Sequence, residues 1–105
     1  MNRIVTDRIP ALVELCKKYR VMRMYLFGSA ARGDFDEDKS DIDLLISFSS
    51  DVTLEEYADN YFDLMFELDE LFGCEVDLVT EKSLKNPYLI SSIDEDKQLI
   101  YEAAA

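Results

Sequence analysis

The sequence lacks histidine and tryptophan altogether, and only two of its 105 residues are cysteines. Without histidine the chain cannot form Ser-His-Asp or Cys-His catalytic groups, and the usual zinc sites with histidine ligands are excluded as well. Cys16 and Cys74 are far apart in the sequence and form no Cys-x-x-Cys pair. We therefore expect no disulfide framework, which is typical of the reducing conditions of the cytoplasm.

Long apolar runs and basic residues are also scarce. No apolar run approaches the roughly 20 residues of a membrane-spanning helix, and the first residues lack the apolar stretch of a signal peptide. Only 11 Lys and Arg stand against 23 Asp and Glu, which gives a net charge of −12. Because such a chain repels the phosphates of nucleic acids and of anionic lipids, we expect neither nucleic acid nor a membrane as a direct partner.

What the sequence does contain is enough apolar residues for a folded domain. They make up 49% of the chain, which is ordinary for a globular protein and too much for a disordered acidic tail. The length fits one domain over residues 1–105. Carboxylates are then the groups left for chemistry, and they favour hard cations such as Mg²⁺.

Hydrophobic periodicity predicts helices that alternate with short strands, the pattern of the α/β or α+β class with a small sheet. Residues 30–40 are predicted as a loop that one helical turn can open, and residues 94–97 as a turn. The last predicted strand has a competing interpretation, in which the helix before it continues to Glu102. The predicted helices cover residues 7–19, 54–72 and 86–93, and the predicted strands cover residues 22–27, 42–48, 75–80 and 98–101.

The helix predicted over residues 54–72 has the clearest boundaries. Thr53 and Glu56 match a capping box ahead of it, and Gly73 terminates it. Phe66 falls on its polar side, where an exposed Phe is either incidental or the mark of a protein interface. The other large apolar side chains are expected on a core-facing half of the helix, which comprises Leu54, Tyr57, Ala58, Tyr61, Phe62, Leu64, Met65, Leu68, Leu71 and Phe72.

Acidic residues are most concentrated between Asp34 and Asp43, where six of ten residues are acids. Asp41 and Asp43 are one residue apart at the start of a predicted strand, so both carboxylates lie on one face of it. Two like charges in this arrangement repel, and a divalent cation with oxygen ligands relieves the repulsion. The alternative is a pair of solvated carboxylates on an edge strand.

Two other features complete a candidate site. Gly28-Ser29 follows the first predicted strand, and a small residue there lets backbone N–H groups approach an anion, although the pair is also a common turn. Asp77 lies in an otherwise apolar strand, where an acid is costly unless it is hydrogen-bonded, paired or metal-bound; the alternative is an edge-strand acid that faces water. Together with Asp41 and Asp43, these residues are the parts of a two-metal site for phosphoryl or nucleotidyl transfer.

These residues also carry a resemblance to a known family. Residues 28–33 (GSAARG) and 41–46 (DIDLLI), seven residues apart, resemble the GSxxRG…SDIDLL signature of the minimal nucleotidyltransferases, small members of the polymerase-β-like superfamily. Residues 74–79 (CEVDLV) resemble the strand that carries the third carboxylate of this family. The resemblance spans residues 5–102. It implies a mixed sheet flanked by helices and the transfer of a nucleoside monophosphate from an NTP to a hydroxyl.

Position by position, the resemblance divides the site residues between metal and nucleotide. Asp41 and Asp43 would ligate two Mg²⁺ ions, and Asp77 would bind the catalytic one and assist deprotonation of the acceptor. Arg32 would contact phosphate or the acceptor, and the alternative is an exposed loop arginine paired with an acidic neighbour. The residues implied in holding the β- and γ-phosphates are Gly28 and Ser29.

The resemblance also implies a partner, because family members of this size are often the antitoxin of a HEPN/MNT toxin–antitoxin pair, the MntA type. Such a protein would transfer AMP from ATP to a tyrosine of a HEPN-domain toxin. Two other interpretations stay open at this point. One is a non-catalytic antitoxin that neutralises a basic partner by contact, for which the net charge of −12 is an argument. The other is a small-molecule nucleotidyltransferase with a separate acceptor-binding subunit.

Overall fold

The computed structural model describes residues 2–33 and 41–104, and all structural statements concern these ranges. Residues 34–40, which hold most of the acid-rich segment and of the predicted loop, lie outside the described residues. The described part of that loop does begin with a single helical turn, α3 (Ser29–Arg32), as the sequence allowed.

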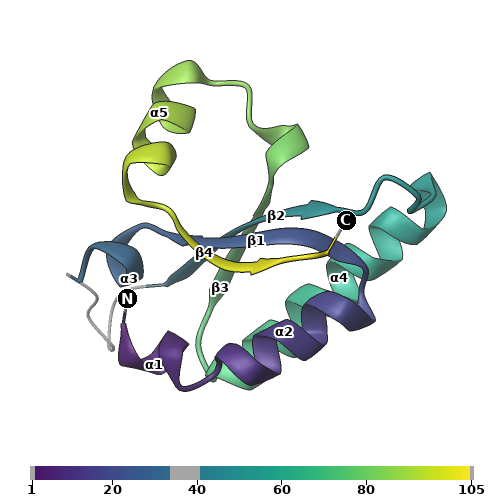
Figure 1. Cartoon of the computed structure of the whole chain (residues 1–105), viewed down its shortest axis with the longest axis horizontal. Coiled ribbons are helices and arrows are strands. Elements are labelled where there is room, and N and C mark those ends of the chain that lie inside the picture. Colours follow the sequence, from purple (N-terminus) through teal and green to yellow (C-terminus); the bar gives the residue numbers. More distant parts are fainter. Residues whose placement is uncertain (1, 34–40, 105) are drawn as a thin grey trace.

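Four strands form a mixed sheet in the order β3-β2-β1-β4 (Figure 1). β1 (Val21–Phe27) runs antiparallel to both of its neighbours, β2 (Ile42–Phe48) and β4 (Gln98–Glu102). β3 (Val76–Thr80) pairs in parallel with β2 and forms one edge of the sheet. The predicted fold class and strands are confirmed, and the last segment is a strand rather than a continuation of the helix before it.

Helices cover both faces of the sheet. α2 (Ile9–Lys18) and α4 (Leu54–Phe72) lie on one face, and α5 (Pro87–Asp96) lies on the other (Figure 1). The structure also contains two short helical elements. α1 (Arg3–Thr6) precedes α2, and the 3₁₀ helix η1 (Glu81–Ser83) follows β3. Among the helices of the described ranges, none is long and apolar enough to cross a bilayer.

The main core lies between the sheet and the layer of α2 and α4. Ile42, Leu44 and Ile46 of β2 are fully buried in it, because alternate side chains of a strand share one face. The same alternation puts Asp43 and Leu45 on the opposite face, where both line cavities that α5 also lines. Other buried members of the core are Val5, Leu12, Cys16, Val21, Met24, Leu26, Ala30, Leu64, Leu68, Phe72, Val76 and Leu78.

α4 begins and ends where the sequence predicted, but its buried face is narrower than expected. The capping box of Thr53 and Glu56 is formed, and Gly73 ends the helix in the left-handed conformation. Leu54 and Phe62 were expected on the core face and are instead 88% and 61% exposed. Each step of four residues turns a side chain by about 40° around the helix axis, so side chains spaced by four drift gradually around the helix. The row that contains Leu54 and Phe62 therefore turns away from the sheet, which covers α4 along one side only.

The boundaries of two other helices differ from the prediction. The helix predicted over residues 7–19 corresponds to α2, which is shorter at both ends and has Pro10 in its first turn. A separate short helix, α1, precedes it and was not predicted. α5 continues through residues 94–96, which were predicted as a turn. The backbone N–H of Lys97 donates to the carbonyl of Ile93, and the side chain of Lys97 pairs with Asp94 at 2.9 Å. These bonds extend the helix by one turn beyond the prediction.

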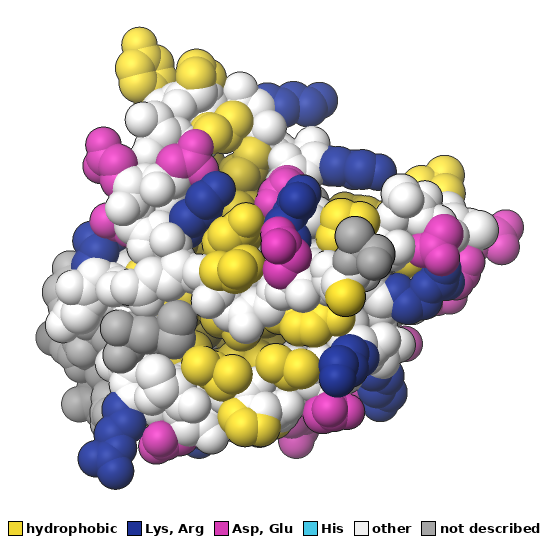
Figure 2. All heavy atoms as spheres, viewed as in Figure 1, with side chains coloured by type: hydrophobic (Ala, Val, Ile, Leu, Met, Phe, Trp, Pro, Cys, Tyr) yellow, Lys and Arg dark blue, Asp and Glu magenta, His cyan; other side chains and the backbone are white. Residues whose placement is uncertain are grey.

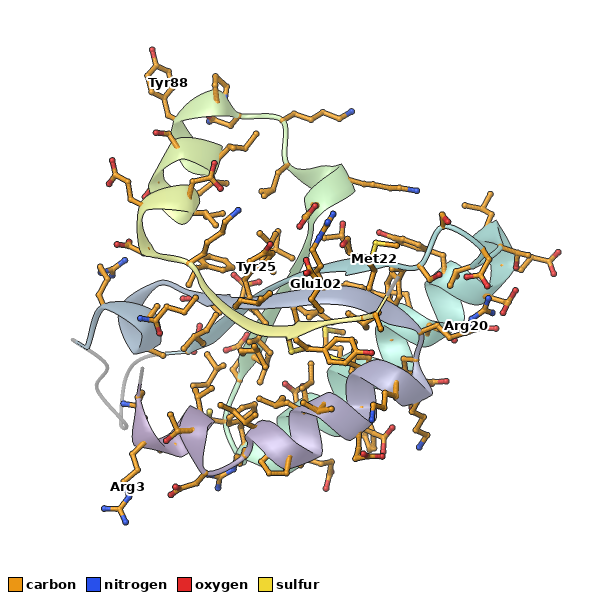
Figure 3. The ribbon with its side chains drawn as sticks, in the orientation of Figure 1. Arg3, Arg20, Met22, Tyr25, Tyr88 and Glu102 are labelled. Carbon is orange, nitrogen blue, oxygen red and sulfur yellow. The ribbon has the colours of Figure 1, made fainter. Side chains whose placement is uncertain are left out.

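The negative charge is spread over several elements of the viewed face rather than gathered in one patch (Figure 2). Arg20 lies beside the start of α4 (Figure 3) and pairs with Asp51 and Glu56, each at 2.7 Å. Lys18 of α2 pairs with Glu67 of α4 at 3.1 Å. α4 alone contains seven acids and no basic residue, so much of the net charge of −12 belongs to a helix surface.

Replacing Thr53 with alanine should lower the free energy of unfolding by about 1 kcal/mol, because the N–H of Glu56 loses the side-chain oxygen that accepts its hydrogen bond. Urea unfolding of the variant measures the loss. Thr53→Ser is the matched control, since it keeps the acceptor and should unfold close to the unsubstituted protein. An equal loss in both variants would contradict the assignment of this cap.

Candidate active site

The site is built where β1 ends and β2 begins. The antiparallel register pairs Phe27, the last residue of β1, with Asp43 of β2. Gly28 follows with φ +73° and ψ −154°, a conformation that is almost exclusive to glycine. A Cβ atom at this position would overlap the Oδ2 atom of Asp43. The turn therefore requires a residue without a side chain in order to pass this close to the carboxylate.

Asp43 is the carboxylate at the centre of the site, and it is half-buried. Its burial and the negative charges of Asp77 and Asp41 raise its pKa from 3.8 to about 6, while the positive charge of Arg32 acts in the opposite direction. The parallel register of β2 and β3 sets Asp77 directly beside Asp43. The structure thus places Asp41 and Asp77 within range of the charge of Asp43.

Asp41 and Asp77 are exposed, unlike Asp43. Asp41 immediately precedes β2. Asp77 lies on the edge strand β3, so its side chain faces water, as the alternative interpretation of the sequence had it, and it also adjoins Asp43. Contact with water explains how an acid is tolerated in an otherwise apolar strand. It also leaves the Asp77 carboxylate accessible from outside the molecule.

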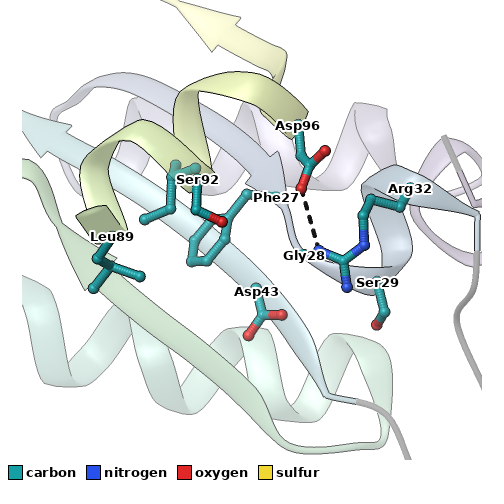
Figure 4. Close-up of a pocket in the computed structure, with 9 residues that line it drawn as sticks. Phe27, Gly28, Ser29, Arg32, Asp43, Leu89, Ser92 and Asp96 are labelled. Atoms are coloured by element: carbon teal, nitrogen blue, oxygen red, sulfur yellow. Dashed lines mark hydrogen bonds and ion pairs between the residues drawn. The ribbon is translucent and has the colours of Figure 1, made fainter. Parts of the chain in front are cut away.

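A cavity of about 300 Å³ opens beside Asp43, between α3 and α5. Figure 4 shows Leu89 and Ser92 of α5 across this cavity from Asp43. All three residues of the predicted phosphate site belong to its wall, so the structure brings them together with the central carboxylate. The lining consists of Phe27, Gly28, Ser29, Arg32, Asp43, Leu89, Ser92, Ile93 and Asp96.

Arg32 reaches from α3 toward α5 at the rim of the cavity. Its Nη1 atom lies 3.2 Å from Oδ2 of Asp96 (Figure 4). Arg32 thus lines the cavity and also pairs with an acidic residue, as the alternative interpretation of the sequence had it, while its contact with phosphate or the acceptor stays a prediction. Its positive charge lowers the pKa of Asp43, so the guanidinium is within electrostatic range of that carboxylate.

Sequence reasoning did not select the α5 side of the cavity. Leu89, Ser92, Ile93 and Asp96 line it, and no local motif marks them, since they follow the aspartate motif by a helix and a strand. No signal for them was available in the sequence. The strand after α5 pairs with β1, so α5 has to cross the sheet face that carries Asp43. That pairing is a long-range property, which a single sequence does not reveal.

The three carboxylates Asp41, Asp43 and Asp77 are chemically suited to bind a divalent cation. Carboxylate oxygens are the ligands that Mg²⁺ prefers, and a cation at Asp43 would relieve the repulsion that raises the pKa of this residue. Within residues 2–33 and 41–104, no three acidic, His or Cys side chains converge into a ready-made metal cluster. Asp41, Asp43 and Asp77 therefore stay predicted ligands, with Asp43 at their centre.

Comparison with known proteins identifies the family of the chain. The model of the nucleotidyltransferase domain matches residues 11–100. The chain belongs to the nucleotidyltransferase domain family. This nucleotidyltransferase is 43% identical over 84 residues to a Methanocaldococcus jannaschii protein, provisionally named a protein adenylyltransferase, with 80% of this chain and 79% of that protein covered. A solved structure provisionally described as a minimal nucleotidyltransferase is 34% identical, with a TM-score of 0.72 and coverage of 93% and 95% of the two chains.

A more distant solved structure shares the fold. It contains a tri-AMPylated Shewanella oneidensis HEPN toxin in complex with MNT antitoxin. The matched chain is 18% identical to this nucleotidyltransferase and has a TM-score of 0.64, with 93% of this chain and 72% of that chain covered. At this identity the likeness concerns the fold alone.

Replacing Gly28 with alanine should lower the free energy of unfolding by roughly 2 kcal/mol, since the residue is forced into a glycine-only conformation and its Cβ meets Asp43. Nucleotide binding should weaken along with stability. The matched control is Gly33→Ala, which also has a positive φ but meets no described atom within 4 Å, and it should cost only about 1 kcal/mol. Urea unfolding of both variants compares them, and equal losses would contradict the close approach of Gly28 to Asp43.

Asp43→Asn should make the metal-free protein more stable at neutral pH. Between pH 3.8 and about 6 the folded chain binds a proton that the unfolded chain has released, so this group's contribution to stability falls as pH rises. The amide has no charge to bury, so the free energy of unfolding of Asp43→Asn should be about 1 kcal/mol higher near pH 7. The gain is no larger because water screens part of the repulsion at a half-buried group.

Urea unfolding in the presence of a chelator measures this gain. It should shrink toward zero as the pH is lowered through the same window, because Asp43 is then protonated in both states. Asp59→Asn, at an exposed position of α4, is the control and should show no such pH-dependent gain. A destabilising effect of Asp43→Asn at neutral pH would contradict the charge repulsion described for the site.

Proposed function

We propose that this nucleotidyltransferase is a Mg²⁺-dependent protein adenylyltransferase that transfers AMP from ATP to a tyrosine of a HEPN-domain toxin, and so acts as its antitoxin. The observation that carries the proposal is the position of Asp43, a half-buried carboxylate next to two like charges and to the Gly28 turn, at the wall of a cavity. A half-buried carboxylate with no cation beside it, next to two other negative charges, destabilises the fold, and a bound magnesium nucleotide would offset this cost.

The nucleotide fits the cavity through its phosphates. A volume of about 300 Å³ lies at the lower end of the range for small-molecule sites. The missing side chain of Gly28 lets the β- and γ-phosphates approach the backbone, and Ser29 adds a hydroxyl donor. Arg32 supplies the positive charge at the rim, where its guanidinium is at present held by Asp96. Leu89 provides an apolar wall on the α5 side.

The carboxylates divide the remaining work. Asp41 and Asp43 would hold both Mg²⁺ ions, and Asp77 would hold the catalytic one. When bound, the metal neutralises charge on the triphosphate and on the attacking and leaving oxygens. The chain's own contribution is to hold Asp43 between the Gly28 turn and Asp77. Among the described residues, Arg32 is the basic group whose charge acts on Asp43.

In the proposed reaction the tyrosine oxygen of the acceptor attacks the α-phosphorus of ATP. A bond forms between that oxygen and the α-phosphorus, the bond from the α-phosphorus to the oxygen that bridges to the β-phosphate breaks, and pyrophosphate leaves. The hydroxyl proton passes to a carboxylate oxygen of Asp77, which is exposed on the edge strand and can be reached by an acceptor side chain. A carboxylate in this role explains how the chain dispenses with histidine.

Three observations support a protein as the acceptor. The Methanocaldococcus jannaschii relative is provisionally named for protein adenylylation. The Shewanella oneidensis structure of the same fold joins MNT antitoxin to an AMPylated HEPN toxin. The net charge of −12 also favours a basic protein partner by accelerating its association.

The proposal is tested by incubating the protein with labelled ATP, Mg²⁺ and the purified HEPN-domain protein encoded beside it. Label should appear on a tyrosine of the partner, as located by mass spectrometry. Asp41→Asn should lower the rate about a hundredfold or more, because charge stabilisation in the transition state is lost. Glu14→Gln, at an exposed acid on α2, is the matched control and should transfer AMP at the normal rate.

The other two interpretations are distinguished by a toxin-neutralisation assay and by the labelling assay, respectively. If Asp77→Ala neutralised the toxin as fully as the unsubstituted protein, contact alone would suffice and the protein would be a binding antitoxin. If label reached only a small molecule in the presence of an acceptor-binding subunit, the protein would be a small-molecule nucleotidyltransferase. Either result would overturn protein adenylylation as the function.

A further inference from the structure

α4 carries a row of exposed apolar side chains that the fold does not use. Leu54 is 88% exposed, Phe62 is 61% exposed and Phe66 is 66% exposed, the last as its polar-side position predicted. Ala58, between them, is also exposed. These residues follow one another at intervals of four, so they are neighbours along the surface of the helix. We call them the α4 stripe.

A groove of about 340 Å³ runs beside the α4 stripe, between α4 and the end of β3. Phe62 packs edge-to-face on Tyr61, with ring centroids 5.3 Å apart. The hydroxyl of Tyr61 in turn donates to the carbonyl of Leu78 at 2.6 Å, which ties the pair of rings to the edge strand. The aromatic wall is therefore held in position before any partner arrives. The groove is lined by Tyr57, Ala58, Tyr61, Phe62, Leu78, Thr80 and Ser83.

Acidic side chains surround the α4 stripe. Neighbours on a helix surface are three or four positions apart, which places Asp59 beside Phe62, and Asp63, Asp69 and Glu70 beside Phe66. α4 contains no basic residue at all. Its seven acids are Glu55, Glu56, Asp59, Asp63, Glu67, Asp69 and Glu70.

We propose that the α4 stripe and its groove dock the acceptor protein, through a surface that presents apolar side chains ringed by Lys and Arg. The apolar centre supplies affinity, and the acidic ring selects a basic rim and speeds association. A second copy of this chain is a poor occupant, because two such helices would bring fourteen acids together. An anionic membrane is repelled for the same reason. This inference rests on the proposed transfer to a protein.

The position of the groove relative to Asp43 supports this role. Leu78 lines the groove, and Asp77, the residue before it on β3, adjoins Asp43 on the opposite face of the sheet. Burial raises the pKa of the Tyr61 hydroxyl, and the negative charge of Asp77 raises it further. A protein seated on α4 and on the edge of β3 is thus beside the carboxylate that is proposed to take the acceptor's proton.

The surface chemistry is tested first without the natural partner. The probe is a synthetic helical peptide with leucines along one face and lysines around them, and its binding is followed by isothermal titration. The double variant Phe62→Ser/Phe66→Ser should bind it about tenfold more weakly or worse. The matched control Tyr88→Ser/Leu99→Ser, which removes apolar side chains that are 86% and 52% exposed on α5 and β4, should bind normally.

Two outcomes of the peptide experiment would overturn the inference. One is equal binding by the two double variants, which would show that the peptide responds only to net charge. The other is no binding to the unsubstituted protein. Sedimentation runs alongside: a dimer that Phe62→Ser/Phe66→Ser dissociates would identify a second copy as the occupant and would contradict the proposal as well.

The transfer assay with the HEPN-domain protein then separates docking from chemistry. Phe62→Ser/Phe66→Ser should raise the KM for the protein acceptor about tenfold or more, with kcat and the affinity for MgATP unchanged. Asp43→Asn should lower kcat and leave acceptor binding intact. Unchanged KM in the Phe variant, with transfer still active, would overturn the docking surface alone. Absence of transfer by the unsubstituted protein would overturn the proposed function, and the peptide result would still decide the chemistry of the surface.

Discussion

The close approach of Gly28 to the Asp43 carboxylate is the constraint on which the rest of the site depends. The antiparallel pairing of β1 with β2 brings the end of one strand to the start of the other, so the turn after β1 has to pass over the carboxylate. Only glycine adopts the required φ and leaves room for Asp43. α3 then begins directly beyond this turn, which puts Ser29 and Arg32 at the same cavity.

Charge has two separate roles in this molecule, although a single count of −12 describes both. On the helices most acids are exposed, and Glu67 and Glu56 of α4 pair with Lys18 and Arg20. At Asp43, burial and two like charges meet, which raises the pKa of that one group to about 6. The edge strand β3 connects both regions, because Asp77 faces the site while Leu78 faces the groove beside α4.

Local patterns predicted most of the elements because each depends on near neighbours in the sequence. Thr53, Glu56 and Gly73 delimit α4 through hydrogen bonds within a few residues. The alternation of β2 puts Ile42, Leu44 and Ile46 on one buried face, although Leu45 on the other face is buried as well. Burial on α4 was wrong at Leu54 and Phe62, because a helical wheel shows which side chains share a face but not how wide a neighbouring layer is. The last turn of α5 was missed, and its Asp96 has a partner, Arg32, that is distant in sequence.

The sequence by itself determined the chemical type of the site: carboxylates without histidine, spaced by one residue on a strand, after a Gly-Ser turn. These are local facts, and the spacing alone sets which side chains share a face. Only the tertiary structure decided which carboxylate is central, because burial and the like charges around Asp43 depend on how β1, β2 and β3 align. It also decided that α5 closes one wall of the cavity and that the α4 stripe stays uncovered. Both follow from packing between segments that are far apart in the chain.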